Sequence, residues 1–592
     1  MCRIAGLVDK SLSAEELLAT VTIMCDSLKH GGPDDSGVYC DAATKVCLGN
    51  RRLAIVDLTA NGHQPMADAN QTTWLTFNGE IYNYQELRSE LASLGVKFHS
   101  NTDTEIVLQA YINWGTESFA RLKGMFAFAV YDAVKKSVYL VRDTNGIKPL
   151  YYSTAGNKLA FASEIRAFKA AKLNNSDDPR WPVWLLALGH IPEPHTTLKD
   201  VQSLPKGHFL CWSENGSFLL EQYFTKEKIS YISNEKIIKQ EVFGLMSQAV
   251  QRQLVADASI GVFLSGGIDS SLITLLAANN DSERLNTISV FFDEKNYDER
   301  AYQNAITQIA NCNNHKHLVQ QQDFDAHLID ILGAMDMPTT DGINTWFISK
   351  YAHEAGLKAV LSGVGADELF GGYPSFNRMK YLPYGKLMPK WASQMAGMID
   401  GRYKKFEYLR YNHPMADYLF LRGLHGPAQI AEILDTSEAE VTGILFNENR
   451  HGTRAYDKEY AAWLETNLYM QNQLLRDTDV LSMSHGLEVR VPFLDEELMA
   501  FVEQIDPSIR FGGRQPKQIL IEAFASMLPK AIWDRPKMGF TFPLQRWMRN
   551  NKHVSDESLY RGKAAKKIMK KFQSGTLHWS RAFALYQVQA HV

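Results

Sequence analysis

The segment Leu264-Ser265-Gly266-Gly267-Ile268-Asp269-Ser270-Ser271 decides how the second half of this chain is expected to fold. A short apolar run, Ile260 to Leu264, leads into it, and the apolar helical pattern Leu272 to Leu276 follows it. Glycines at such a strand-to-helix turn let the backbone approach an anion, and the start of the helix supplies free N–H groups. The segment therefore predicts a phosphate-binding loop. The sequence has no G-x-x-x-x-G-K-[ST] stretch, which excludes a loop of the kinase or GTPase type.

Two further apolar strands are predicted after this loop, at Thr287 to Phe291 and at Lys358 to Leu361. They alternate with helical segments, a pattern typical of a parallel, doubly wound sheet. Ser362 and Gly363 follow the second of these strands. Since open α/β sheets bind ligands beyond the carboxyl ends of their strands, the two loops are expected to face one crevice. From about Asp417 onward the pattern is mostly helical.

The first part of the chain has a different pattern, rich in strands with a few helices. Thr73 to Phe77 is predicted to be a strand that ends at a turn, Asn78-Gly79, and the runs 124–131 and 137–141 are predicted to pair. A polar stretch from Tyr223 to Lys236 separates this part from the rest. We therefore predict two domains, residues 2–222 and 236–592.

Cys2 lies directly behind the initiator methionine. Removal of Met1 would give one residue a thiol and a free α-amine, whose pKa of about 7.7–8.0 suits it to accept a proton at neutral pH. Such a pairing at a chain terminus activates a nucleophile without a histidine. Any residue can follow Met1, so this hypothesis depends on whether the chain builds a site around Cys2.

Composition narrows the classes of function. The 592 residues include 62 Lys and Arg against 66 Asp and Glu, a net charge of −4, so no general attraction to nucleic acid or to an anionic membrane is expected. The six cysteines form no disulfide framework or zinc pattern. There is no secretory signal and no apolar run of the roughly 20 residues that span a bilayer. These features predict a soluble protein with reduced thiols in the cytoplasm.

The loop Ser265 to Ser270 resembles the PP-loop of the ATP pyrophosphatases, which break ATP between its α and β phosphates. Together with Cys2, five other segments resemble glutamine-hydrolysing asparagine synthetases, and they occur in the order of that family: 50–57, 78–83, 101–105, 142–151 and 488–495. The resemblance implies a class II N-terminal-nucleophile glutamine amidotransferase fused to a PP-loop synthetase domain. The implied fold is an α+β N-terminal Ntn-type sandwich (αββα), followed by an α/β PP-loop domain with a parallel sheet and a helical C-terminal part.

The resemblance also implies site residues. In the first domain Cys2 attacks the side-chain amide of glutamine, and the side chain of Asn78 and the N–H of Gly79 bind the oxyanion. The glutamine-binding residues are Arg52, Asn78, Gly79, Glu80 and Asp103. In the second domain Lys517 stabilises adenylation, and Asp269 and Asp367 bind Mg²⁺. The implied ATP-binding residues are Leu264, Ser265, Gly266, Gly267, Asp269, Ser270, Val290, Ser362 and Gly363.

The segment expected to contact the carboxylate acceptor departs from the family pattern. The implied acceptor-side residues are Val364, Asp367, Glu368 and Tyr373, and Val364 replaces the usual acidic residue. The stretch 338–345 lacks the arginine that some asparagine synthetases have near aspartate, and the stretch 30–34 has glycine where the family commonly has arginine. The first two departures fall on the acceptor side, so they leave glutamine and ATP as expected substrates but weaken the case for aspartate.

The leading hypothesis is a glutamine- and ATP-dependent synthesis of asparagine from aspartate, with release of AMP, pyrophosphate and glutamate. The first alternative is amidation of another carboxylate, such as a hexuronic acid of a surface polysaccharide. An intramolecular ligase of the β-lactam synthetase kind is disfavoured because Cys2 is retained, and a non-catalytic glutamine or nucleotide sensor ranks lowest. Neither nucleic acid nor a membrane is an expected partner, and assembly as a homodimer is left open.

Overall fold

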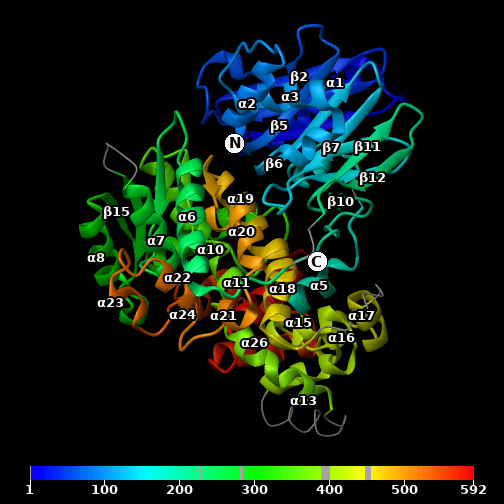
Figure 1. Ribbon diagram of the computed structural model, residues 1–592. Helices are drawn as coiled ribbons and strands as arrows, with labels where there is room; N and C mark the ends of the chain where they lie inside the picture. The colour runs from blue at the N-terminus through cyan, green and yellow to red at the C-terminus, as the bar shows by residue number, and fades with distance from the viewer. Residues whose placement is uncertain are drawn as a thin grey trace.

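The computed structural model describes residues 2–174, 176–225, 230–279, 285–387, 401–446 and 455–591, and it describes only the backbone of 401–404 and 591. Figure 1 shows two lobes. Most of the first 222 residues, coloured blue to cyan, form the upper lobe, and later residues form the larger lower lobe. One helix of the first part, α5 (Trp181–Leu188), packs instead against lower-lobe helices such as α27 (Trp579–His591).

Two six-stranded antiparallel sheets form the upper lobe. The first has the strand order β10-β8-β9-β1-β3-β2, and the second has the order β12-β11-β7-β6-β5-β4. The strands of the first sheet, in that order, are Gln202–Ser203, Tyr151–Ser153, Leu159–Ala162, Cys2–Val8, Val46–Arg52 and Asp35–Asp41. Those of the second are Phe218–Gln222, His208–Ser213, Ser137–Arg142, Gly124–Asp132, Thr73–Ile81 and Met66–Ala67.

Alternating side chains join these sheets into four layers. Because successive residues of a strand point to opposite faces, Ile4 and Leu48 pack between the sheets against Ala129 and Leu140. Helix α1 (Ala14–Ser27) covers the outer face of the first sheet. Helices α2 (Tyr84–Ser93) and α3 (Asp103–Trp114) cover the second sheet. The predicted αββα sandwich is confirmed.

A five-stranded parallel sheet lies in the lower lobe, with the order β15-β14-β13-β16-β17. Its strands, in that order, are Asn313–Leu318, Asn286–Phe291, Ile260–Phe263, Ala359–Leu361 and Glu488–Arg490. Strands β13 and β16 are neighbours although about a hundred residues separate them, so the order of strands reverses there. Ligands of open α/β sheets bind at this kind of reversal.

Helices make up most of the remaining lower lobe, as predicted (Figure 1). Those near the sheet are α6 (Glu235–Gln253), α7 (Ile268–Ala278), α8 (Arg300–Ala310), α9 (Gln321–Ala334) and α10 (Ile343–Glu354). Later helices that position the site include α11 (Ala366–Phe370), α15 (Pro414–Arg422), α18 (Lys458–Leu464), α19 (Leu475–Met483) and α22 (Gln518–Ala523). A π-helical segment, η7 (Glu465–Leu474), joins α18 to α19.

The structure corrects two expectations. The predicted turn at Asn78-Gly79 is wrong, because β5 continues through both residues to Ile81 and pairs with β6 along its whole length. The expectation that all six cysteines are reduced thiols is also wrong. Cys40 and Cys47, which are opposite each other on β2 and β3, form a disulfide. Within the described ranges, no helix is long and apolar enough to cross a membrane.

Candidate active sites

Cys2 begins β1, and the antiparallel register places it opposite Arg52 of β3. Its side chain is buried, and its nitrogen, which removal of Met1 would turn into an α-amine, donates to Oδ1 of Asn78 at 3.3 Å. Burial raises the pKa of the Cys2 thiol, while the positive chain terminus and Arg52 act in the opposite direction. A thiol that is mostly protonated needs a base, and an α-amine on the same residue would provide one.

Asn78 and Gly79 belong to β5 of the second sheet, and this part of β5 lies beside Cys2. The Nδ2 group of Asn78 is buried and has no hydrogen-bond partner among the described residues. An unsatisfied buried donor is unfavourable unless a ligand uses it. There is no space for a side chain at Gly79, because a Cβ there would lie 2.2 Å from the carbonyl oxygen of Met125. The pair thus offers a donor poised beside the thiol, as an oxyanion site requires.

Arg52 and Asp103 provide opposite charges close to Cys2, and both act on the pKa of its thiol. The guanidinium of Arg52 donates to the carbonyl oxygens of Thr59 at 2.9 Å and Asp57 at 2.5 Å. The carboxylate of Asp103 accepts from the N–H of Ile81 at 2.9 Å. Burial raises the pKa of Asp103 to about 6, against the effect of this hydrogen bond. A zwitterion such as glutamine has a carboxylate and an ammonium that match these charges.

Sequence reasoning missed Gln64. Its Nε2 lies 3.9 Å from the Cys2 Sγ, and its Oε1 accepts from the N–H of Phe77 at 2.7 Å and from Nδ2 of Asn50 at 3.0 Å. The side chain therefore links β3, β5 and the nucleophile. Gln64 belongs to a loop with no periodic pattern, so only the fold reveals that it reaches Cys2.

Glu80 reaches the second lobe. Its carboxylate lies 3.3 Å from the guanidinium of Arg490 on β17, and Arg490 also pairs with Glu488 at 2.5 Å. Burial raises the pKa of Glu80 well above its usual value, although Arg490 opposes the shift. The carbonyl oxygen of Arg490 accepts from the N–H of Ser362 at 2.8 Å. Arg490 therefore connects β5, which contains Gly79 and Glu80, with the second predicted nucleotide loop at Ser362.

The two predicted nucleotide loops meet, as expected, at the carboxyl ends of β13 and β16. A Cβ on Gly363 would lie 2.8 Å from the Cβ of Asp269. Gly266 has a φ of +88°, a conformation that favours glycine. Ser265 Oγ lies 3.0 Å from Ser270 Oγ and accepts from the N–H of Gly267 at 3.3 Å. These contacts shape the loop around the N-terminus of α7, where phosphate oxygens are readily bound.

The remaining predicted nucleotide contacts lie on the neighbouring strand ends. Leu264 is buried, and its carbonyl oxygen accepts from Ser289 Oγ at 2.9 Å. Val290 is also buried, and its carbonyl oxygen accepts from Nε2 of Gln303 at 3.2 Å. The carbonyl oxygens of both residues are therefore already bonded, and their side chains offer apolar surface.

Lys517 lies between the two predicted metal ligands. Its Nζ is 2.6 Å from the carboxylate of Asp269 and also pairs with Asp367. Burial alone would lower the pKa of Lys517, but the two carboxylates raise it. Lys537, which sequence reasoning missed, pairs with Asp367 at 2.7 Å. Burial raises the pKa of Asp367, but the two lysines outweigh it and lower this pKa to about 2.

The predicted acceptor side contains more charge than its sequence segment indicates. Tyr373 donates to Glu368 at 2.9 Å, and burial, together with Asp367, raises the pKa of Glu368 to about 7. Arg422, missed in the sequence, lies over the rings of Tyr373 at 4.5 Å and Tyr469 at 3.7 Å. Its Nε is 2.7 Å from Glu465. Arg422 thus brings a cation beside Tyr373 from α15, a distant helix that no local motif identifies.

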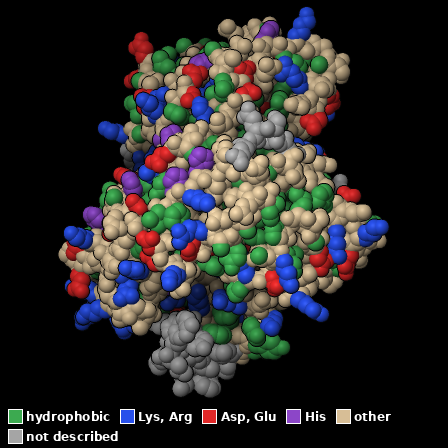
Figure 2. Space-filling view, turned by 90° about the vertical axis from the view of Figure 1, so that its left-hand side faces the viewer, with side chains coloured by type: hydrophobic (Ala, Val, Ile, Leu, Met, Phe, Trp, Pro, Cys, Tyr) green, Lys and Arg blue, Asp and Glu red, His purple; other side chains and the backbone are tan. Residues whose placement is uncertain are grey.

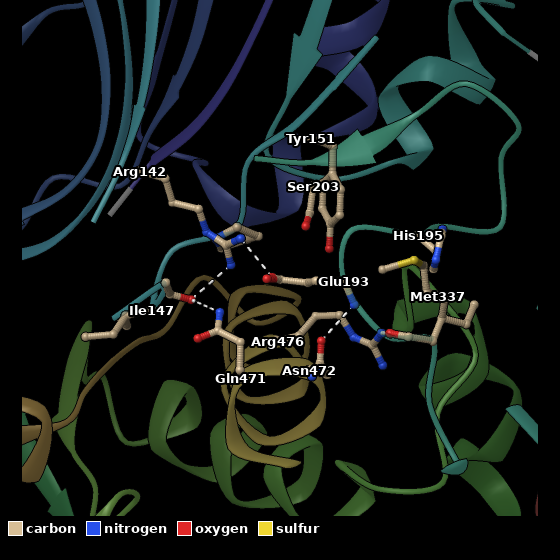
Figure 3. A pocket seen from close by; sticks show the side chains of 13 residues that line it. Arg142, Ile147, Tyr151, Glu193, His195, Ser203, Met337, Gln471, Asn472 and Arg476 are labelled. Carbon is tan, nitrogen blue, oxygen red and sulfur yellow. Dashed lines mark hydrogen bonds and ion pairs between the residues drawn. The ribbon is translucent and has the colours of Figure 1, made fainter. Parts of the chain in front are cut away.

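A small cavity lies between the lobes, with a volume of about 10 Å³ (Figure 3). This volume is about what one water needs. Arg142 pairs with Glu193 at 2.8 Å on the upper side, and Asn472 and Gln471 of η7 border the lower side. On the outer surface seen in Figure 2, acidic and basic side chains are interspersed, in line with the small net charge.

Comparison with known proteins agrees with this two-site arrangement. A family described as glutamine amidotransferase domain matches residues 1–224, and one described as asparagine synthase matches residues 241–584. The chain belongs to the asparagine synthase family. It is 30% identical to "Asparagine synthetase [glutamine-hydrolyzing] 1" of Bacillus subtilis over 569 residues, which cover 93% of this chain and 88% of that protein.

Other proteins similar to this chain carry different names. A "Putative asparagine synthetase [glutamine-hydrolyzing]" of Mycobacterium tuberculosis is 31% identical over 88% of this chain and 84% of its own. "Amidase chry2" of Gibberella zeae is 26% identical over 90% of this chain and 86% of its own. Membership in the family thus establishes a glutamine-dependent amidotransferase related to the asparagine synthetases, and the acceptor has to be argued from the site.

Proposed function

We propose that this chain transfers the amide nitrogen of glutamine to the side-chain carboxylate of aspartate, with cleavage of ATP to AMP and pyrophosphate. The observation that carries the proposal is the presence of two complete sets of reactive groups in one chain. Cys2 has an unpartnered donor, Asn78 Nδ2, beside it. The loop at Ser265 meets Asp269, Asp367 and Lys517 at one crevice.

In the first site the Cys2 Sγ attacks the amide carbon of glutamine, and the α-amine takes the thiol proton. Asn78 Nδ2 and the N–H of Gly79 stabilise the oxyanion, and the α-amine returns the proton to the departing ammonia. Water then hydrolyses the thioester to glutamate. Arg52 binds the α-carboxylate and Asp103 the α-ammonium, with Glu80 completing the glutamine site. Preorganised oxyanion donors are worth roughly 3–4 kcal/mol each.

In the second site an oxygen of the acceptor carboxylate attacks the α-phosphorus of ATP, and pyrophosphate leaves. Ammonia then attacks the acyl carbon, and AMP leaves with the electrons of the acyl–oxygen bond. The loop Ser265–Ser270 binds the leaving pyrophosphate, Leu264, Val290, Ser362 and Gly363 contact the nucleotide, and Lys517 stabilises the charge that develops. Mg²⁺ neutralises charge on the pyrophosphate when bound. Asp269 and Asp367 fit it, because Mg²⁺ is typically held by one or two carboxylates plus phosphate oxygens.

The acceptor side supports an amino acid as acceptor. Aspartate carries an α-carboxylate and an α-ammonium besides the group that is activated. Arg422 suits the first, and the carboxyl groups of the half-buried Asp341 and of the buried Glu368 and Glu465 suit the second. These residues compensate for the missing acidic residue at Val364. A sheltered transfer of ammonia between the two sites is part of this proposal, because free ammonia is mostly protonated in neutral water.

A hexuronic acid of a surface polysaccharide is the second candidate. Val364 favours it, since valine cannot pair with an amine, and a uronic acid has none. The rings of Tyr373 and Tyr469, 5.8 Å apart, give the apolar surface against which a sugar ring packs. Under either candidate we place the protein in the cytoplasm, where ATP and glutamine are available. Assembly as a homodimer remains a prediction.

The deciding experiment supplies glutamine, ATP and Mg²⁺ with either L-aspartate or a glucuronate oligosaccharide. Pyrophosphate release and amide formation with aspartate, absent with the uronate, would support the proposal. The reverse would support the second candidate. If neither compound led to pyrophosphate release while glutamine was still hydrolysed, both proposed acceptors would be contradicted.

A further inference from the structure

The residue after the nucleophile contacts the other lobe. Arg3 is completely buried, and its Nε lies 2.7 Å from Glu164 of the upper lobe. Its NH1 lies 2.7 Å from the carboxylate of Asp479, on α19 of the lower lobe. Because side chains alternate along β1, Arg3 points away from the glutamine site. Arg3 therefore does not touch the reacting atoms but connects the strand of Cys2 to the synthetase domain.

The fold makes room for this arginine and balances its charge. A Cβ on Gly31 would lie 2.7 Å from Cγ of Arg3, so glycine in the stretch 30–34 leaves the space that the arginine fills. Asp479 also pairs with Lys148 at 3.0 Å. Burial raises the pKa of Asp479, but Arg3 and Lys148 outweigh it and lower this pKa. Asp479 is thus an ionised lower-lobe group held by two cations of the upper lobe.

Asp479 belongs to one continuous helical segment that also reaches the acceptor side. The segment runs through α18, η7 and α19, and helical backbone angles persist across both junctions. Glu465, where η7 begins, pairs with Arg422, and η7 packs against α11, which contains Asp367 and Glu368. Glu465 and Asp479 are therefore roughly 20 Å apart along one helix. The π-helical turn is a geometry frequent at functional sites.

We infer that Arg3 is a positioning residue which, through Asp479, makes the reactivity of Cys2 depend on ligand binding in the synthetase domain. A ligand that moves α11 shifts the helix, and the Arg3–Asp479 pair passes the shift to β1, whose first residue is Cys2. The inference rests on the proposed function, because it assigns Cys2 as the glutaminase nucleophile.

The test measures how fast a diazo-ketone analogue of glutamine alkylates Cys2, with and without a non-hydrolysable methylene analogue of ATP plus Mg²⁺. Neither reagent requires the acceptor to be known. The variants are Arg3→Met, Arg3→Lys and Asp479→Asn. The matched control is Arg51→Met. Arg51 lies opposite Arg3 on the neighbouring strand, and it pairs with Asp26 of the same lobe instead of with the lower lobe.

We expect the ATP analogue to accelerate alkylation several-fold in the wild type and in Arg51→Met. In Arg3→Met and Asp479→Asn the acceleration should fall below twofold, and Arg3→Lys should restore part of it. Thermal unfolding shows whether each variant is folded. If Arg3→Met does not fold, the comparison of Arg3→Lys and Asp479→Asn with the wild type tests the inference. A wild-type response retained in folded Arg3 and Asp479 variants, or no response in the wild type, would overturn the inference. Absence of alkylation at Cys2 in every protein would instead contradict the proposed function.

Discussion

The two sites of the chain satisfy their polar groups in opposite ways. Beside Cys2, the Asn78 Nδ2 donor is buried and unpartnered, so this site presents a group before any charge has developed. In the synthetase crevice the charged groups pair with one another, with Lys517 between Asp269 and Asp367. The first site is therefore organised for an oxyanion in advance, whereas the second must exchange its internal ion pairs for phosphate oxygens and a metal ion. The predictions below act on one site at a time.

The largest effect is expected for Cys2→Ala. Loss of the nucleophile should reduce glutamine-dependent amide formation by roughly 10⁴-fold or more, because no other group can form the thioester. Synthesis driven by ammonium chloride should remain within about twofold of the wild type. Glutamate release and amide formation are measured in parallel, and unchanged glutamine turnover would refute the assignment of Cys2.

Lys517→Met is the corresponding change in the second site. Removal of one preorganised charge should slow pyrophosphate release by about 10²–10³-fold, while glutaminase activity without ATP stays unchanged. The control is Lys530→Met, which removes an exposed lysine with 74% of its side chain accessible. If both lysine variants slowed pyrophosphate release equally, Lys517 would have no specific role.

Only part of each site could be predicted from the sequence alone. Cys2, Asn78 and the Ser265 loop lie in short motifs, so their neighbourhood could be predicted from local pattern, as could the parallel sheet of the lower lobe, whereas the two antiparallel sheets of the αββα sandwich followed from the family resemblance. Gln64, Arg422 and Lys537 lie outside any periodic or motif pattern, and only tertiary folding brings them to the sites. The wrong turn at Asn78-Gly79 has a physical cause. This pair is typical of hairpin turns, but pairing with β6 and the close approach of Met125 keep it extended.

A smaller effect is expected from pH on the glutaminase site. Burial raises the pKa of Asp103 to about 6, so its carboxylate is protonated below this pH and no longer attracts the α-ammonium of glutamine. The α-amine of Cys2 must also be deprotonated, so kcat/KM for glutamine hydrolysis already falls below the pKa of that amine. Below the pKa of Asp103 the fall should steepen by a further factor of about ten per pH unit. Asp103→Asn should have low kcat/KM without this inflection. An inflection that persists in Asp103→Asn would assign it to another group.

The smallest effect is expected far from both sites. Asn234 caps α6 by accepting from the N–H groups of Lys236 at 3.1 Å and Ile237 at 3.2 Å. Asn234→Ala should lower the free energy of unfolding by about 1 kcal/mol and leave both half-reactions unchanged. Denaturant unfolding and the two activity assays check this. A loss of activity without a loss of stability would show that α6 influences a site directly.

The central claim is that nitrogen released at Cys2 is consumed by ATP-dependent amidation in the second domain. It is tested most directly with glutamine labelled with a heavy nitrogen isotope in its side-chain amide, in the presence of ATP, Mg²⁺, aspartate and excess unlabelled ammonium. The account predicts label in the amide of asparagine, at a higher fraction than in the free ammonium. Label that appears only in free ammonium, with no isotope in any amide product, would contradict it.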